Sequence, residues 1–530
     1  MARQWQQDEQ DAARDVGGFR EDMDLRRIEM RNPALTRSGR EAVGGERTRS
    51  LRGSTVGSQG GPKYRAYRRH NFRDLSQIQL LSPEEQFAIE VVAQVLPFKT
   101  NSYVVEELIN WDDVPQDPIF LLNFPQREML LPRHFDEVAD LLRRGADKEE
   151  IGQVANRIRL ELNPHPAGQL DHNVPTLGDT RLTGMQHKYE ETVLFFPSEG
   201  QTCHAYCTFC FRWPQFVGMD ELKFAMRETE LLVEYVRDHP EVTDVLVTGG
   251  DPMTMCARKL ARYVDPLLEA RLPNLRTIRI GTKSLSYWPY RFLTDDDADD
   301  VLDLFRRITR AGIHLAFMAH VNHPRELSTS AVEEAIARIR ETGAEVRTQA
   351  PLLRNINDRP EVWSEMWQRQ VELGCVPYYM FVARDTGAQH YFSVPLVRSW
   401  EIFRDAYQRV SGLARTVRGP SMSADPGKVE ILGVTTVAGK KVIALRMLQG
   451  RNPDWVMRPF FAKYDEKATW LSDLRPAFGE KRFFFEEELE ERYCARNVGW
   501  HGRYVNGGRA AVTLAALTAG AWYARKRWLS

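Results

Sequence analysis

The stretch Gly200-Gln-Thr-Cys-His-Ala-Tyr-Cys-Thr-Phe-Cys-Phe-Arg212 contains three of the six cysteines in this 530-residue chain. These three, Cys203, Cys207 and Cys210, have the spacing C-x3-C-x2-C. Cysteine thiolates are the usual ligands of iron–sulfur clusters, so a short loop with three of them can bind three irons of a [4Fe–4S] cluster. The fourth iron of such a cluster has no protein ligand nearby and is open to a small chelating molecule.

Three clustered cysteines are also compatible with other kinds of site. They can be buried thiols, part of a disulfide, or a zinc site with His204 as its fourth ligand. Zinc sites usually combine a C-x2-C pair with a distant second pair, and the chain has no second pair. The spacing therefore favours an iron–sulfur cluster, with zinc and structural thiols as the alternatives.

The composition limits the other classes of function. A formal net charge of −1 gives no bulk electrostatic reason to expect nucleic acid or a membrane surface as a partner. Six cysteines in so long a chain do not form a disulfide scaffold. Free thiols and an oxygen-sensitive cluster both indicate a reducing compartment, and the N-terminus lacks the apolar stretch of a secretory signal. We therefore expect a cytoplasmic protein.

Changes in composition along the chain predict its domain organisation. The first residues are rich in charge, Gly and Ser, which is typical of a flexible tail. The last residues hold an apolar run of about fifteen residues, which is short for a membrane span, so we expect a docked or frayed helix there and no span. The expected parts are a charged tail (1–62), a helical N-terminal domain (63–185), a barrel (186–400), a C-terminal region (401–500) and a C-terminal tail (501–530).

Local signals place helices and strands outside the barrel. Ser82 is a helix N-cap before Pro83, which suits the first helical position. The expected elements are helices over 100–110 and 134–163 and strands over 430–434 and 441–447.

Short apolar runs alternate with amphipathic helical stretches between residues 186 and 400. Strands that alternate with helices predict a parallel sheet with covered faces. We therefore expect an α/β fold, with a partial (β/α)6 barrel whose reactive residues lie at the C-terminal ends of the strands. The cysteine loop follows the first strand and falls on that face. The candidate strands are 192–196, 244–248, 277–281, 314–321, 345–350 and 376–382.

The cysteine spacing, with Phe209 before the third cysteine, resembles the signature of the radical S-adenosylmethionine (SAM) enzymes. Thr248-Gly-Gly-Asp-Pro252 follows the second strand, and its glycines let the backbone approach a ligand closely. In radical SAM proteins, a glycine-rich stretch at this place contacts the methionine amino group of SAM. The resemblance thus implies that Gly249, Gly250 and Asp251 bind SAM, although many strand-to-helix turns use two glycines.

A closer resemblance is to the lysine 2,3-aminomutase family, over residues 64–435. It implies that a reduced cluster cleaves SAM to a 5′-deoxyadenosyl radical, which takes hydrogen from an amino acid held as an imine on pyridoxal phosphate (PLP). The amino group then moves between C2 and C3. The motifs that carry the resemblance are His187-Lys-Tyr, Thr248-Gly-Gly-Asp-Pro, Ile278-Arg-Ile-Gly-Thr, His320-Val-Asn-His-Pro, Leu352-Leu-Arg-Asn-Ile-Asn-Asp and Pro377-Tyr-Tyr.

The resemblance also implies partners. They are a small-molecule amino acid and a reductant such as flavodoxin or ferredoxin. The resemblance leaves open whether the chain forms a homo-oligomer. The alternative is a radical SAM enzyme on the same scaffold that acts without PLP on a small molecule, a protein or RNA.

Family roles carry over to individual residues of this chain. Arg212 matches the arginine that pairs with the substrate carboxylate, a task that suits a planar guanidinium. Lys188 and Tyr189 match the region that holds PLP. His320 and Gln349 match positions near SAM, with ordinary strand-end hydrogen bonding as the alternative.

The PLP lysine is expected at Lys428. The family's glycine-rich segment before this lysine is absent here. The segment Ser423-Ala-Asp-Pro-Gly-Lys428 instead resembles the shorter one in the aminomutases that make the β-lysine of elongation factor P. The alternative for Lys428 is an exposed loop lysine.

Two departures from the family pattern concern the substrate and zinc. Arg384 stands where the family has an aspartate for the distant amine of lysine, and an arginine attracts a carboxylate instead. A shift of one residue would give that role to Asp385, and Asp425 lies near the position of a second aspartate. Because Asn357-Asp-Arg359 has Arg in place of a zinc-binding Cys, and no C-terminal cysteine cluster exists, we expect no zinc.

Overall fold

The structure is a computed structural model that describes residues 61–163, 171–219 and 222–501. The charged tail expected over 1–62 and the tail expected over 501–530 therefore lie almost entirely outside the described residues. Within the described part of the chain, no helix is long and apolar enough to cross a membrane.

One mixed sheet organises the described chain, in the order β15-β14-β13-β12-β11-β10-β9-β8-β7-β6-β5. Its centre is parallel from β6 to β12. The strands of the barrel are β6 (Thr192–Phe195), β7 (Asp244–Val247), β8 (Thr277–Thr282), β9 (His314–His320), β10 (Glu345–Leu352) and β11 (Val376–Val382).

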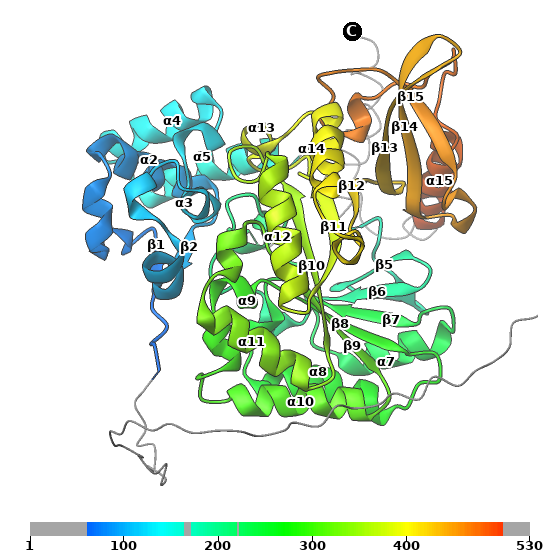
Figure 1. Ribbon diagram of the computed structural model, residues 1–530, viewed down its shortest axis with the longest axis horizontal. Helices are drawn as coiled ribbons and strands as arrows, with labels where there is room; N and C mark the ends of the chain where they lie inside the picture. Colours follow the sequence, from blue (N-terminus) through cyan, green and yellow to red (C-terminus); the bar gives the residue numbers. More distant parts are fainter. Residues whose placement is uncertain (1–60, 164–170, 220–221, 502–530) are drawn as a thin grey trace, which may run out of the picture. The chain divides into compact units, whose positions relative to one another are not determined.

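A helix follows each barrel strand, and Figure 1 shows α8, α10 and α11 along the outer side of the strands. The six units of the described chain and the open strand order confirm the predicted α/β fold with a partial (β/α)6 barrel. All six predicted strands agree with the structure to within two residues. The helices are α7 (Thr229–Asp238), α8 (Ala257–Glu269), α10 (Ala298–Arg310), α11 (Ser330–Glu341), α12 (Pro360–Glu372) and α14 (Leu396–Gln408).

Antiparallel strands extend the sheet at both edges. At one edge, β5 (Met185–Tyr189) pairs with β6. Strand β5 was not predicted from the sequence. At the other, β12 (Arg418–Ser423) pairs parallel to β11, and β13, β14 and β15 continue antiparallel. The two predicted C-terminal strands lie inside β13 (Gly427–Val437) and β14 (Lys440–Gly450), and β15 is Pro459–Lys463.

The N-terminal region is mostly helical, as predicted. The Ser82 hydroxyl accepts from the Glu85 N–H, and Pro83 opens α2, so this cap is confirmed. The predicted helix over 100–110 is wrong in part, because Lys99–Asn101 form β2, paired with β1 (Ala66–Arg68). The helices are α2 (Pro83–Val95), α3 (Pro118–Asn123), α4 (Pro132–Arg143) and α5 (Lys148–Glu161).

A buried ion pair ties together the loops after β8 and β9. The Lys283 Nζ lies 2.6 Å from Glu326 Oε1 and also donates to Asn322 Oδ1 at 2.9 Å. Glu326 is fully buried and also accepts from the Asn322 N–H. The pair thus fixes two strand ends at the face where barrel enzymes place their reactive residues.

Removing one partner of this pair should destabilise the fold strongly. In Glu326→Ala the Lys283 ammonium would stay buried without its counter-charge, which typically costs about 3–5 kcal/mol. We expect that loss in the free energy of unfolding measured by denaturant titration. The matched control is Glu334→Ala on the exposed side of α11, for which we expect a change within about 0.5 kcal/mol. Equal effects of the two variants would contradict this role of the pair.

Candidate active site

A cavity of about 380 Å³ lies at the C-terminal ends of the barrel strands. Its volume is in the range of sites for small molecules and cofactors. Most of the residues expected to carry chemistry line it together. These are Cys203, Cys207, Cys210, Arg212, Gly249, Gly250, Asp251, His320, Gln349, Lys188, Tyr189, Arg384 and Lys428.

The three cysteines of the loop are free thiols on the wall of this cavity. Burial raises the pKa of Cys210 to about 11 and that of Cys207 to about 12. Their thiolates thus need a nearby positive charge, which a bound metal cluster supplies. Among the described residues, no three His, Cys, Asp or Glu side chains converge on a single ion. A cluster does not require such convergence, because it binds each thiolate through a different iron.

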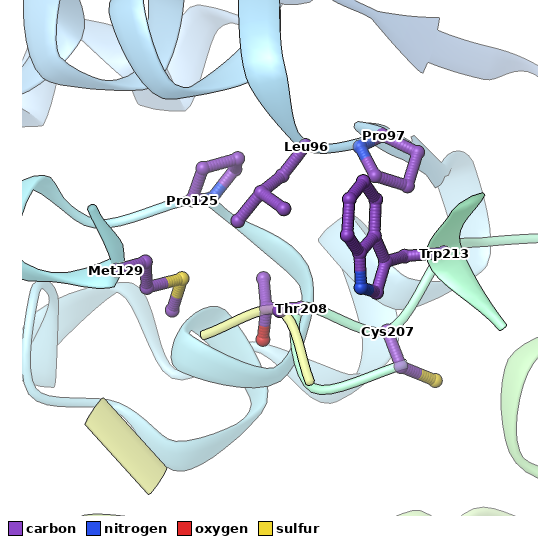
Figure 2. A pocket seen from close by; sticks show the side chains of 8 residues that line it. Leu96, Pro97, Pro125, Met129, Cys207, Thr208 and Trp213 are labelled. Carbon is purple, nitrogen blue, oxygen red and sulfur yellow. The ribbon is translucent and has the colours of Figure 1, made fainter. Parts of the chain in front are cut away.

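The back of the cysteine loop packs on the N-terminal helical region. The Thr208 hydroxyl donates to the Leu121 carbonyl at 2.7 Å, and its N–H donates to the Leu122 carbonyl at 3.0 Å. The Cys207 sulfur points away from this packed side (Figure 2). Figure 2 also shows Thr208 and Trp213 facing Leu96, Pro97, Pro125 and Met129.

Residues of strand β2 hold the first half of the cysteine loop through hydrogen bonds. The buried Lys99 donates to the Cys203 carbonyl at 2.5 Å, and its own carbonyl accepts from the Tyr206 N–H at 2.8 Å. The buried Asn101 amide donates to the carbonyls of His204 and Tyr287. Sequence reasoning missed Lys99 and Asn101 because a buried lysine and asparagine leave no periodic signal.

The glycine turn after β7 packs directly on the start of the cysteine loop. A Cβ on Gly250 would lie 2.4 Å from the Thr202 carbonyl oxygen, and Gly249 has a φ of +139°. Gly250 is therefore needed for the close approach of two backbone segments, whereas Gly249 is needed for its positive φ. The sequence analysis expected glycines here so that the backbone can approach a ligand. Packing against Thr202 is a second reason for a glycine at position 250.

Asp251 anchors the turn through its carboxylate. It accepts from the Met253 N–H, the Thr282 hydroxyl, the Lys283 N–H and the Ser284 hydroxyl, at 2.7 to 3.0 Å. Its own N–H donates to the Thr202 carbonyl at 2.6 Å. Four protein donors thus occupy the carboxylate, which makes Asp251 a positioning residue although it also lines the cavity.

His320 and Gln349 lie side by side on β9 and β10. The Gln349 Nε2 is 2.9 Å from the His320 Nε2. Burial, with the cations Lys283 and Arg212 nearby, lowers the pKa of His320 to about 3. The imidazole is therefore neutral and accepts a hydrogen bond from the glutamine amide.

Lys428 lies on β13 with its amine in the cavity, which rules out the exposed loop lysine that the sequence left open. The Nζ donates to Gln449 Oε1 at 3.0 Å and lies 4.1 Å from the centre of the Tyr379 ring. Burial, together with the charges of Arg279 and Arg418, lowers the pKa of Lys428 to about 7. A substantial fraction of the amine is therefore unprotonated near neutral pH.

Lys188 and Tyr189 reach the same cavity from β5. The Lys188 ammonium donates to the Ala424 carbonyl, in the segment that leads to Lys428. Burial lowers the pKa of Lys188 well below its ordinary value and raises that of Tyr189. The edge strand β5 thus places a basic side chain beside the segment that precedes Lys428.

Two arginines flank the Phe211 ring. The guanidinium carbon of Arg212 is 5.1 Å from the ring centre and that of Arg384 is 4.9 Å from it. Burial lowers the pKa of Arg212 to about 10 and also lowers that of Arg384. Arg384 donates to the Ser423 carbonyl at 3.1 Å.

The two aspartates proposed for substrate do not join this group. Neither Asp385 nor Asp425 is among the described residues that line the cavity. Asp425 is exposed and pairs with Arg451 at 2.9 Å, and the Tyr493 hydroxyl donates to its carboxylate. The structure therefore brings Arg384, and not Asp385, to the cavity wall.

Known proteins similar to this chain include aminomutases. A putative L-lysine 2,3-aminomutase of Aquifex aeolicus is 31% identical over 407 residues, 77% of this chain and 95% of the relative. The L-lysine 2,3-aminomutase of Clostridium subterminale is 25% identical over 253 residues, 48% of this chain and 57% of the relative. A solved radical SAM methyltransferase from Sphaerobacter thermophilus covers 55% of this chain and 94% of its own, with a TM-score of 0.33 and 17% identity. No family model matches the sequence.

A side chain at position 250 should displace the cysteine loop. In Gly250→Ala the new methyl group would overlap the Thr202 backbone, and such overpacking costs about 1–3 kcal/mol. We expect a lower midpoint of thermal unfolding and less iron bound per chain after anaerobic reconstitution. Gly412→Ala is the matched control, because a Cβ there meets no atom within 4 Å. Normal iron content in Gly250→Ala would refute this packing constraint.

Proposed function

The chain belongs to the lysine 2,3-aminomutase family of radical SAM enzymes, and we propose that it is a PLP-dependent aminomutase. It would move the amino group of an amino acid between C2 and C3, with an electron from a reductant such as ferredoxin or flavodoxin. One observation carries the proposal. Lys428, an amine with a pKa lowered to about 7, lines the same cavity as the three cysteines.

The cysteine side of the cavity fits a [4Fe–4S] cluster with SAM. Three thiols from one loop face a space that is also lined by the Gly249–Gly250 turn and the His320–Gln349 pair. A reduced cluster with SAM supplies a carbon radical that abstracts hydrogen. The protein's part is to hold the loop in place, through Lys99, and to keep the cysteines on the cavity wall.

The opposite side of the cavity fits PLP. Lys428 supplies the amine that PLP requires, and Gln449 orients it. Lys188 and Tyr189 would bind the phosphate, since the Lys188 amine is a basic group of the cavity that pairs with no carboxylate among the described residues, and a phosphate would favour its charged form. Bound PLP supplies a π system that stabilises charge and radical character next to the amino group. In this proposal β12–β14 form the PLP-binding region.

Arg212 would bind the α-carboxylate of the amino acid. Its guanidinium has no hydrogen-bond acceptor or carboxylate partner within the described chain, and it stacks on Phe196 at 4.3 Å. A buried cation without a counter-charge is costly, and a carboxylate that accepts two N–H groups removes that cost. Because Arg212 is two residues past Cys210, the substrate would lie beside the cluster.

The function is tested by incubating the reconstituted protein with single amino acids, SAM, PLP and a reductant without oxygen. We expect one β-amino acid product, identified by NMR and mass spectrometry. In Lys428→Ala we expect loss of the visible absorption of lysine-bound PLP and at least about a 10³-fold loss of product, because the nucleophilic amine is gone. Lys440→Ala, at an exposed strand end, should retain both. Wild-type protein that binds no PLP would refute the proposal and favour the PLP-independent alternative.

The attachment of PLP to Lys428 should depend on pH with a midpoint of about 7. The lowered pKa means that the amine is protonated, and not nucleophilic, below pH 7 and neutral above it. For an ordinary lysine, the midpoint of this pH dependence would be about 10.4. The measurement is the rate at which apo protein gains the PLP absorption across a pH series. A midpoint near that of free lysine would contradict the burial of this amine.

A further inference from the structure

We propose that the substrate carries a second carboxylate at the end of its side chain, as glutamate does, and that Arg384 binds it. This inference rests on the proposed function, because it assumes that Arg212 holds the α-carboxylate. It makes Arg384 the residue that selects the side chain.

The first argument is the geometry of the two arginines. Both guanidinium groups stack on the Phe211 ring, and the sum of the two ring distances limits the separation of their central carbons to about 10 Å. Both side chains line the same cavity. Two such cations, held on one aromatic ring, lie within reach of the two ends of one short diacid.

The second argument is the balance of charge on the cavity wall. Arg279 is neutralised by Asp244 at 2.7 Å, and Lys283 by Glu326 at 2.6 Å. In the part of the chain that the structure describes, four lining basic side chains pair with no carboxylate within 4 Å, and two of them, Arg212 and Arg384, are guanidinium groups that stay charged at neutral pH. The four are Lys188, Arg212, Arg384 and Lys428.

Three of these four basic side chains already have a role in the proposed function. Lys428 would bind PLP covalently, Lys188 would bind its phosphate and Arg212 would bind the α-carboxylate. Arg384 is left without an anion. A dicarboxylic amino acid supplies the missing charge, whereas lysine would add a further cation.

The third argument concerns the acids that a lysine side chain would need. The carboxylate of Asp251 is occupied by four protein donors, and Asp425 is held by Arg451 outside the cavity. Asp385 favours the charged form of Arg384 but is not among the lining residues. An ε-ammonium would therefore meet a guanidinium, and like charges at a desolvated site select strongly against it.

The competing anion for Arg384 is the PLP phosphate. Lys188 lies close enough for the charge of Arg384 to lower its pKa further. We assign the carboxylate because Arg384 shares Phe211 with the arginine that follows the cysteines. The Ser423 carbonyl accepts from one of the five N–H donors of Arg384. A bidentate pair with a carboxylate needs two donors, so enough of them remain for it.

The test is direct binding to PLP-loaded protein, followed as the change in visible absorption when an amino acid is added. We expect wild-type protein to bind glutamate at least about 30-fold more tightly than glutamine or lysine, since loss of a charged partner costs about 2 kcal/mol or more. Arg384→Gln should remove this preference and keep its PLP content and absorption. Arg398→Gln, an exposed arginine on α14, should behave as wild type. With SAM and reductant, wild-type protein should convert glutamate to its 3-amino isomer.

Each other outcome overturns a defined part of the model. Loss of PLP in Arg384→Gln would assign this arginine to the phosphate and refute the inference, and so would a variant that keeps PLP and still prefers glutamate. A β-amino product from lysine but not from glutamate would refute the inference and keep the aminomutase function. Absence of PLP binding, or of product from every amino acid, would refute the proposed function and the inference with it.

Discussion

The contact between the backbone of Asp251 and that of Thr202 fixes the active site to the barrel. The Asp251 N–H donates to the Thr202 carbonyl at 2.6 Å, and Gly250 leaves no room for a side chain between the two segments. The Asp251 carboxylate in turn binds the loop after β8. One buried acid therefore connects the cysteine loop, the glycine turn and the next strand end, so that the position of the cysteines follows from the register of the sheet.

Burial of cations sets the chemistry of the opposite wall. Desolvation lowers the pKa of Lys428 to about 7 and that of Arg212 to about 10. The Lys428 amine is therefore partly unprotonated at neutral pH, whereas the Arg212 guanidinium stays charged and pairs with no carboxylate among the described residues. The same burial, with Lys283 and Arg212 nearby, keeps His320 neutral. The cavity thus combines neutral nitrogen groups with positive charges that suit anionic ligands.

The barrel and the cysteine loop could be predicted from short-range signals in the sequence, whereas the other candidate site residues, such as His320 and Lys428, were expected only from the resemblance to a family. Buried strands give continuous apolar runs, and the cysteine spacing is local. The remaining features depend on contacts between distant segments. Strand β5 carries the polar run Gln186–Tyr189, and the buried Lys99 contacts the Cys203 carbonyl, which is more than a hundred residues away in the sequence. Gln449 reaches Lys428 across a strand pair, which local patterns do not predict.

The two ends of the proposed substrate site are built by different parts of the chain. Arg212 and Phe211 belong to the cysteine loop, so the α-carboxylate site is covalently tied to the metal-binding thiols. Arg384 follows β11 and is oriented by the Ser423 carbonyl on β12. The Arg384 side chain is not a partner in the hydrogen bonds of Lys99 and Thr208 that hold the cysteine loop. The segments that carry the two arginines meet at the Phe211 ring and at the 3.1 Å hydrogen bond from the Trp213 indole to the Thr386 hydroxyl. In our proposal, a substitution of the Arg384 side chain therefore changes the choice of substrate and leaves these contacts of the cysteine loop in place.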